Sequence, residues 1–344
     1  MKVNSFNYNT LLFFIVRCLF IGICFTNLIA ISKLDSCISI IIASLISVLP
    51  LLLYNYISNK YEDLNIYEII NNNYISLILS IFVFFFSSFI YFNIINLISS
   101  QFLYKTPDIL ISLIFIISII YANYKGLNTI LRISTILFYI TFLIIITSFF
   151  SLIYESDITN LMPVLNNGLE GVFKGSFHFI TLNTLPLFLL LVIPKNYISR
   201  SFKSNLIMNF ISIFTLLIIC FLVLTIYGVD VAKLFHYPEF HLFKRIALMG
   251  FIKRLENIFA LQWMFDYFIF ISFSIYFICQ NPIIKKVKYN FIIVPLLLVF
   301  TTNIIFKSNT QACLFYLNVL PYLSFVFFLI LPIFLSIKKD TNPI

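Results

Sequence analysis

The sequence predicts an all-α integral membrane protein: a single transmembrane domain over residues 1–344, with ten membrane-spanning helices. Three observations predict this fold class. Ten apolar runs are each long enough to cross a hydrocarbon core of roughly 30 Å, which takes about 20 helical residues. Only 10% of the residues are charged, and the mean hydropathy is +1.05. Because lipid offers the backbone no hydrogen-bond partners, such runs must form helices rather than open sheets.

The expected spans follow one another along the whole chain. They cover residues 10–31, 37–57, 74–98, 107–123, 133–154, 175–194, 206–227, 258–279, 289–306 and 312–337. Loops rich in Lys and Arg stay in the cytoplasm. If the N-terminus is cytoplasmic, the loops on that side hold Lys60, Lys125, Arg132, Lys195, Arg200, Lys203, Lys285, Lys286, Lys288, Lys338 and Lys339. The short outer loops hold only Lys33, Lys105, Lys174 and Lys307. This bias predicts that both termini are cytoplasmic.

The longest connection, residues 228–257, is predicted to be an extracytoplasmic helical loop. From Glu239 to Leu255 its only helix breaker is Gly250, and Phe240, Phe243, Ile246, Ala247 and Phe251 recur at helical spacing. A surface helix of imperfect amphipathicity is expected. It would serve either as a lid or partner-docking element, or simply lie among the lipid headgroups.

Ten helices divide into five plus five, which predicts an inverted repeat in which helices 1 and 6 are discontinuous. In the first span Gly22 lies midway and is followed by Cys24 and Thr26. In the sixth, three polar side chains precede Pro186, which removes a backbone N–H. Interrupted helices expose peptide donors and carbonyls that suit a zwitterion such as an amino acid. The expected substrate-binding residues are Gly22, Cys24, Thr26, Thr181, Asn183 and Thr184. The plainer alternative is that Gly and Pro are ordinary in membrane helices and that Thr and Asn bridge neighbouring helices.

Three ionisable residues inside the spans need an explanation. Asp266 lies within the eighth span, where a charged carboxylate is costly, so it is either a proton- or cation-coupling group or part of a structural hydrogen bond or ion pair within the bundle. His178, early in the sixth span, is either a gating group or a structural histidine. Arg17 is expected to be structural, with its long stem reaching towards the cytoplasmic surface.

Motifs for enzymatic chemistry are missing from the sequence. It has no Ser–His–Asp arrangement, no HExxH and no Gly-rich phosphate loop, so no enzyme activity and no cofactor are expected. The three histidines do not share a helical face, and the six cysteines have no CxxC spacing and are expected to be small buried hydrophobes, which gives no metal site. The net charge of +9 is spread over short loops, so nucleic acid is not an expected partner.

Four stretches resemble a known family. They are DSCISIIIASLISVLPLLLYNYISNKYEDLNIYEI (35–69), TPDILISLIFIISIIYANYKGLNTILRIS (106–134), NLMPVLNNGLEGVFKGS (160–176) and YPEFHLFKRIALMGFIKRLENIFALQWMF (237–265). Their order and topology resemble the spore germination receptor B subunits, which belong to the amino acid–polyamine–organocation transporter superfamily. The resemblance covers about residues 22–279. It implies a ten-helix fold, the spore inner membrane or bacterial cell membrane, a receptor A subunit and a lipoprotein C subunit as partners, and small germinants, typically amino acids.

Two departures from that family matter for the ligand. Members usually have a Gly-x-Gly and a later proline in the first helix, whereas here Gly22 is followed by Ile23 and Cys24, and Asn27 stands near the proline position. An acidic residue is common at the break of the sixth helix, where this chain has Asn183 and Thr184. The resemblance therefore implies that an ammonium-binding carboxylate is missing there.

The expected function is that of a membrane subunit that binds a small germinant such as an amino acid and signals to partner subunits. Ligand binding would produce the signal by favouring one conformation of the subunit over another. One alternative is a proton- or cation-coupled amino-acid permease that uses the same pocket, with Asp266 in the coupling role. The other is a structural or pore-forming subunit without a specific ligand site.

Overall fold

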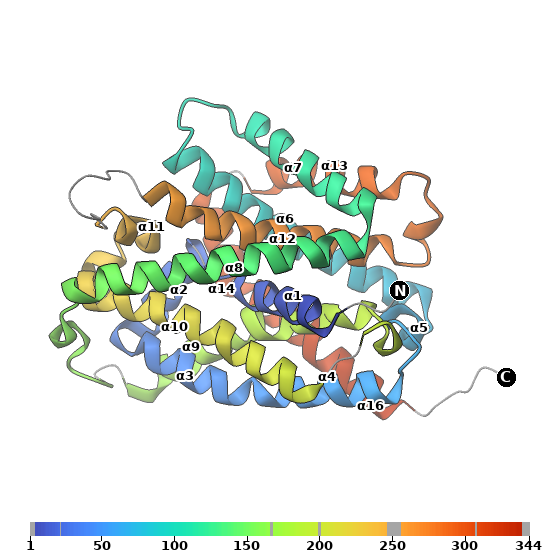
Figure 1. Cartoon of the computed structure of the whole chain (residues 1–344), viewed down its shortest axis with the longest axis horizontal. Helices are drawn as coiled ribbons and strands as arrows, with labels where there is room; N and C mark the ends of the chain where they lie inside the picture. Colours follow the sequence, from blue (N-terminus) through green and yellow to red (C-terminus); the bar gives the residue numbers. More distant parts are fainter. Residues whose placement is uncertain are drawn as a thin grey trace.

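The computed structural model describes residues 4–20, 22–165, 168–198, 201–245, 256–306 and 308–338. Over these residues the chain is helical and forms no β-sheet (Figure 1). The α-helices are α1 (Ser5–Arg17), α2 (Ile23–Ser32), α3 (Ser36–Ile46), α4 (Val48–Lys60), α5 (Ile66–Ile70), α6 (Asn73–Gln101), α7 (Asp108–Lys125), α8 (Leu127–Leu152), α9 (Gly168–Phe179), α10 (Phe202–Ala232), α11 (Pro238–Phe243), α12 (Glu256–Cys279), α13 (Asn290–Ile305), α14 (Asn309–Asn318), α15 (Leu320–Phe325) and α16 (Leu331–Ile337). Short 3₁₀ and π segments connect some of them.

Eight helices of the described chain are long and apolar enough to cross a membrane, or nine if the bent pair α13 and α14 counts as one span. The first predicted span is not among the eight as a separate helix, because it is divided. Its first half, α1, has 13 residues, and its second half, α2, runs on into α3 and α4 as one long helical stretch, Ile23–Lys60. The protein is an integral membrane protein.

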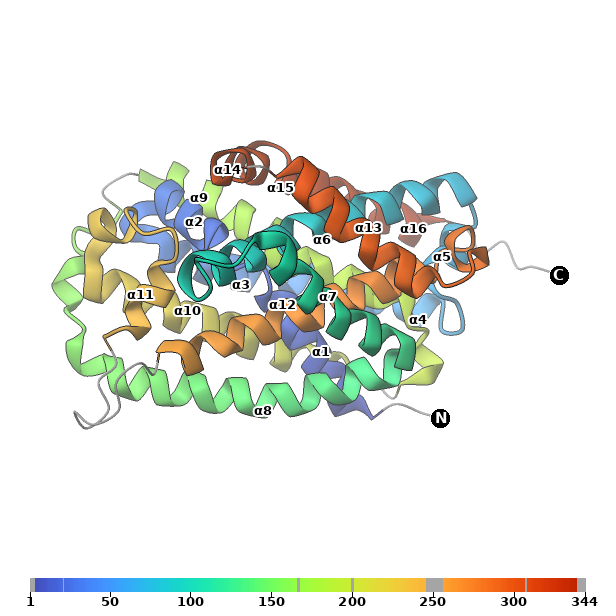
Figure 2. The same cartoon turned by 90° about the horizontal axis from the view of Figure 1, so that it is seen from above.

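The short helix α1 lies at the centre of the bundle. Every residue from Tyr8 to Arg17 is buried, and α1 packs against α8, α10 and α12. In turn α12 packs against α6, α7 and α8, while α9 packs against both α2 and α3. Figure 2 shows α8 along one side of the bundle and α14 and α15 on the opposite side. The start of α1 and the end of α16 lie at the same end of the molecule, and α11 lies near the opposite end (Figure 1).

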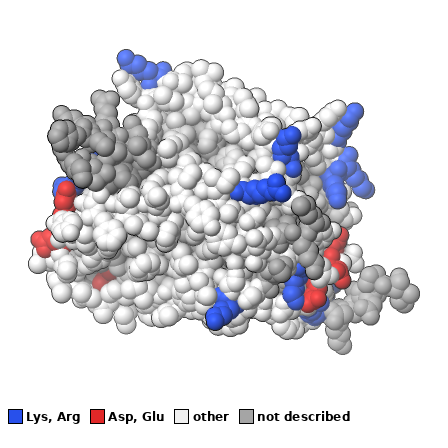
Figure 3. Space-filling model, in the orientation of Figure 1, with Lys and Arg blue, Asp and Glu red and all other residues white. Residues whose placement is uncertain are grey.

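The outer surface suits a lipid environment. Exposed Ile, Leu, Phe and Tyr side chains line α7, α8 and α13, including Ile114, Leu143 and Phe300 at 64–69% exposure. Most of the face in Figure 3 has no charged atoms, and more of its Lys and Arg side chains lie in the half that holds the ends of α4 and α16. Apolar side chains therefore cover much of the surface between the two ends of the bundle.

The loop between α10 and α12 differs from the expected surface helix. Its described part contains α11, whose residues Phe240 and Phe243 are buried. Their rings pack against Trp263 of α12 at centroid distances of 6.5 and 5.2 Å. The prediction of a surface position is wrong for α11, because its aromatic residues pack into the bundle instead of facing the headgroups. Residues 246–255 of the predicted helix lie outside the described residues.

Candidate functional site

The backbone of the first span is interrupted in the middle of the bundle. Helix α1 ends at Arg17, and a short turn follows in which the N–H of Phe20 donates to the carbonyl of Arg17 at 3.2 Å. Helix α2 begins at Ile23 after Gly22, whose φ of +61° lies in a region that favours glycine. The turn therefore leaves peptide groups at the end of α1 and the start of α2 without partners in their own helices.

The sixth span changes its helical type at its polar residues. Helix α9 ends at Phe179, the backbone continues as a π-helical turn over Ile180–Thr184, and a 3₁₀ helix runs over Leu185–Val192. Pro186 lies near the start of that 3₁₀ helix and cannot donate a backbone hydrogen bond. Wide turns of this kind inside helices often occur at functional sites.

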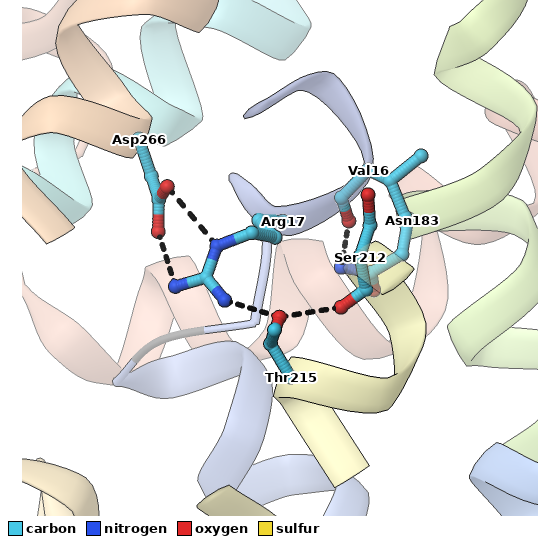
Figure 4. A network of polar contacts seen from close by, with 6 residues as sticks. All are labelled: Val16, Arg17, Asn183, Ser212, Thr215 and Asp266. Carbon is cyan, nitrogen blue, oxygen red and sulfur yellow. Dashed lines mark hydrogen bonds and ion pairs between the residues drawn. The ribbon is translucent and has the colours of Figure 1, made fainter. Parts of the chain in front are cut away.

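Asn183 connects the two irregular spans. Its side-chain amide donates to the carbonyl of Val16 at 2.9 Å, so a side chain from the π turn caps the end of α1 (Figure 4). Among the described residues, the hydroxyl of Thr181 donates to the carbonyls of Phe177 and His178 one turn earlier in the same span. The hydroxyl of Thr184 is buried and has no partner among the described residues. Polar groups from the first and sixth spans therefore meet at the end of α1.

The start of α2 is covered by the segment that contains α11. The N–H of Gly22 donates to the carboxyl group of Glu239 at 2.6 Å. The ring of Tyr237 lies so close to Gly22 that a Cβ added at Gly22 would be 2.5 Å from its Cε1 atom. Thr26 donates to the carbonyls of Phe235 and His236 at 3.4 and 3.3 Å. The segment from Phe235 to Glu239 therefore covers the start of α2, and the N–H of Gly22 bonds to a side chain of this segment.

Arg17 and Asp266 form a buried ion pair beside this interruption. Arg17 Nε and Nη2 donate to the two carboxylate oxygens at 3.2 and 3.1 Å, and both residues are 0% exposed. A third donor, Nη1, bonds to Thr215, whose hydroxyl donates to the carbonyl of Ser212 (Figure 4). Arg17 does not reach towards the surface as expected, because the opposite charge of Asp266 compensates it inside the bundle.

His178 and Cys24 lie on either side of Tyr316. The rings of His178 and Tyr316 are 6.0 Å apart, and the Tyr316 hydroxyl donates to the carbonyl of Cys24 at 3.2 Å. His178 is buried, and its Nδ1 atom has no partner among the described residues.

The residues named from the sequence fall into two groups that approach each other through α1. Gly22, Cys24 and Thr26 begin α2, while Thr181, Asn183 and Thr184 form the π turn, which packs against α1. Sequence reasoning missed Glu239 and Tyr237. The available signal was an acidic residue within the largely apolar stretch YPEFHLF, but its place in a loop pointed to the surface.

A separate polar cavity lies at the end of the bundle where α10 ends. Its volume is about 590 Å³, and it is lined by residues of the loop before α9 and by Tyr227, Gly228, Asp230 and Lys233 of α10. Neither Gly22 nor the π turn lines it.

Comparison with known proteins places the chain in a family. Residues 7–312 match the spore permease family, described as "Spore germination protein". The chain belongs to this family. It is also 23% identical over 246 residues to the Bacillus subtilis (strain 168) protein named "Putative spore germination protein YfkT", with 69% of this chain and 67% of that protein covered. The family is permease-like, helical and membrane-embedded, and typically non-enzymatic.

Proposed function

We propose that this protein is the membrane subunit of a spore nutrient-germinant receptor that binds a small germinant such as an amino acid and signals to partner subunits. The observation that supports it most is the interruption of the first span between Arg17 and Ile23, next to the π turn Ile180–Thr184. Peptide donors at the start of a half-helix suit a carboxylate, and carbonyls at the end of the other half suit a cation. Here the N–H of Gly22 already bonds to a carboxyl group, that of Glu239.

The proposal includes a fold of ten spans in a five-plus-five inverted repeat, with the first and sixth discontinuous, in one domain. The described chain has up to nine candidate spans, in which Ile23–Lys60 counts as one. If α1 and α2 together form the first span and α3 and α4 the second, the number becomes ten, which supports this fold. The shared location of the first and last helical ends supports an even number of crossings (Figure 1). We place both termini in the cytoplasm, the protein in the spore inner membrane, and a receptor A subunit and a lipoprotein C subunit as its partners, as family membership favours.

The structure bears on the permease alternative through Asp266. A coupling carboxylate must gain and lose a proton or cation during each transport cycle, whereas Asp266 forms two hydrogen bonds with Arg17. Uptake of an amino acid by proteoliposomes that contain this chain alone would establish the permease. Binding without uptake would favour the receptor.

Ligand binding is tested by thermal unfolding of the purified protein with each of the twenty amino acids. A ligand of the folded state raises the Tm in a concentration-dependent way. Thr184→Tyr puts a bulky ring beside the end of α1 and should abolish this rise, while Thr147→Tyr, on the exposed side of α8, should preserve it. The Tm of each variant without ligand shows whether it folds. A scaffold without a ligand site would show no rise in the wild-type protein, and the proposal would then fail.

A further inference from the structure

The carboxyl group of Glu239 has an unusual environment. It is 0% exposed, and its Oε1 atom accepts the hydrogen bond from the N–H of Gly22. Its Oε2 atom is buried and has no partner among the described residues. A buried polar atom without a partner is costly, and a buried carboxylate without a cation is costlier still. Such an atom at a proposed ligand site needs an explanation.

The described groups that sense the charge of Glu239 include no cation. They are Cys24 of α2, Tyr267 of α12 and Tyr237 of its own segment. Among the described residues no Lys, Arg or His forms an ion pair with it. Burial raises the pKa of Glu239 to about 8, so the group is mostly protonated at neutral pH in this closed arrangement. An entering cation would replace that proton.

The surroundings favour an organic cation over a metal ion. No group of three or more His, Cys, Asp or Glu side chains in the described chain could hold a metal. The ring of Tyr237 lies against Gly22, the residue that bonds to Glu239, and an aromatic ring beside a carboxylate adds to the attraction for an ammonium ion. The hydrogen bond from Gly22 stabilises the ionised carboxylate once a cation is present.

We infer that Glu239 is the binding partner of a primary ammonium group on the ligand, with Oε2 as its acceptor and Gly22 as the residue that holds the carboxylate in place. The inference rests on the proposed ligand site at the interrupted first span and names the ligand group that binds there. The carboxylate comes from the loop before α12, since the π turn Ile180–Thr184 contains no acidic residue. Because Glu239 is fully buried, ligand entry requires the segment from Phe235 to Phe243 to move away from α2.

The test uses methylammonium chloride as the probe and the purified full-length protein. The Tm is measured in rising methylammonium, with potassium chloride replacing it to hold the ionic strength constant. The Tm of the wild-type protein should rise, and more so above pH 8 than below it, because the proton competes with the cation for Glu239. Glu239→Gln keeps an oxygen acceptor for the Gly22 N–H and should bind methylammonium at least about tenfold more weakly. Glu170→Gln, at an exposed ion pair on α9, should behave as the wild type.

A second measurement does not depend on the variant folding. Below pH 8 methylammonium binding should release a proton from Glu239, which a pH indicator detects in weakly buffered wild-type protein. Absence of both the release and the rise in Tm overturns the inference, as does an equal response in folded Glu239→Gln. An equal rise in Tm with amino acids in the wild type and in Glu239→Gln, but none in Thr184→Tyr, would support the proposed ligand site and contradict the proposed role of Glu239. If no amino acid stabilises the wild type, the proposed function falls.

Discussion

Two buried carboxyl groups beside the interrupted first span have opposite surroundings. Asp266 faces the guanidinium of Arg17 and receives two hydrogen bonds from it. Glu239 receives one hydrogen bond from a peptide N–H and meets no cation among the described residues. Electrostatics therefore separates their roles: the charge of Asp266 is compensated within the protein, whereas the Oε2 atom of Glu239 has no partner among the described residues.

Removing one member of the Arg17–Asp266 pair should destabilise the protein strongly. Arg17→Met or Asp266→Leu leaves a buried charge without its partner, at a cost of about 3–5 kcal/mol in the free energy of unfolding. The double variant removes both charges and should be more stable than either single variant. Thermal unfolding of the four proteins in detergent measures this coupling. Removal of the exposed pair Glu170–Lys174 is the control and should leave the Tm almost unchanged. Additive effects of Arg17→Met and Asp266→Leu would contradict a direct pair.

Glu239 should make stability depend on pH. Its ordinary pKa of 4.5 rises to about 8 on folding, because burial disfavours the charged form. Between these values the folded protein holds a proton that the unfolded chain has released, so stability falls as the pH rises through this window. The slope is about 1.4 kcal/mol per pH unit for this one group. The difference in Tm between wild type and Glu239→Gln, followed from pH 4.5 to 8, isolates its contribution. A constant difference across the window would contradict the raised pKa.

At the scale of the elements, the division of the first span depends on a glycine. Gly22 has a positive φ and lies against Tyr237 and Asn93. This part of the site was predictable from the sequence, because glycine midway through an apolar run indicates an interrupted helix. In the sixth span, Pro186 and the polar residues before it likewise indicated an irregular helix, and the structure has a π turn followed by a 3₁₀ helix there.

Gly22→Ala should disturb the interruption more than the matched change at Gly126. Both glycines have a positive φ and a ψ outside the left-handed helical region, so alanine costs on the order of 1–3 kcal/mol of backbone strain at either position. At Gly22 a Cβ would also meet the Tyr237 ring at 2.5 Å, whereas at Gly126 nothing lies within 4 Å. We therefore expect a further loss of about 1–3 kcal/mol at Gly22 alone, from overpacking. Thermal unfolding of both variants measures the difference in stability. Equal losses of stability would show that the contact with Tyr237 does not contribute to the cost at Gly22.

The residues that bond to the interrupted first span could not be predicted from the sequence. Periodicity and helix-breaking residues are local signals, whereas the Gly22–Glu239 bond joins residues 217 positions apart and the Arg17–Asp266 pair joins residues 249 positions apart. The ambiguity at Asp266, coupling group or ion pair, had this origin. The position of α11 was missed for a related reason, since its aromatic residues fit a headgroup helix and a buried helix equally well.

At the scale of the whole molecule, composition alone was enough to predict an all-helical membrane protein. The number of spans is harder to count in the structure. Helices α1 and α2 are each too short to cross a membrane, and α2 continues into α3 and α4 as one helical stretch. A bundle whose central helix is interrupted can change conformation around that point without exposing polar backbone to lipid. Such a change, passed to partner subunits, is how the proposed receptor would signal.

The account depends most on the claim that a small solute binds at the interrupted first span. The most direct measurement is an electron cryo-microscopy structure of the purified protein with the amino acid that raises its Tm most, compared with the structure without it. The account predicts ligand density between the start of α2 and the π turn Ile180–Thr184, with the Oε2 atom of Glu239 against the ligand and its Oε1 atom still bonded to the N–H of Gly22. Ligand density in the polar cavity near Gly228, and none beside Glu239, would contradict it.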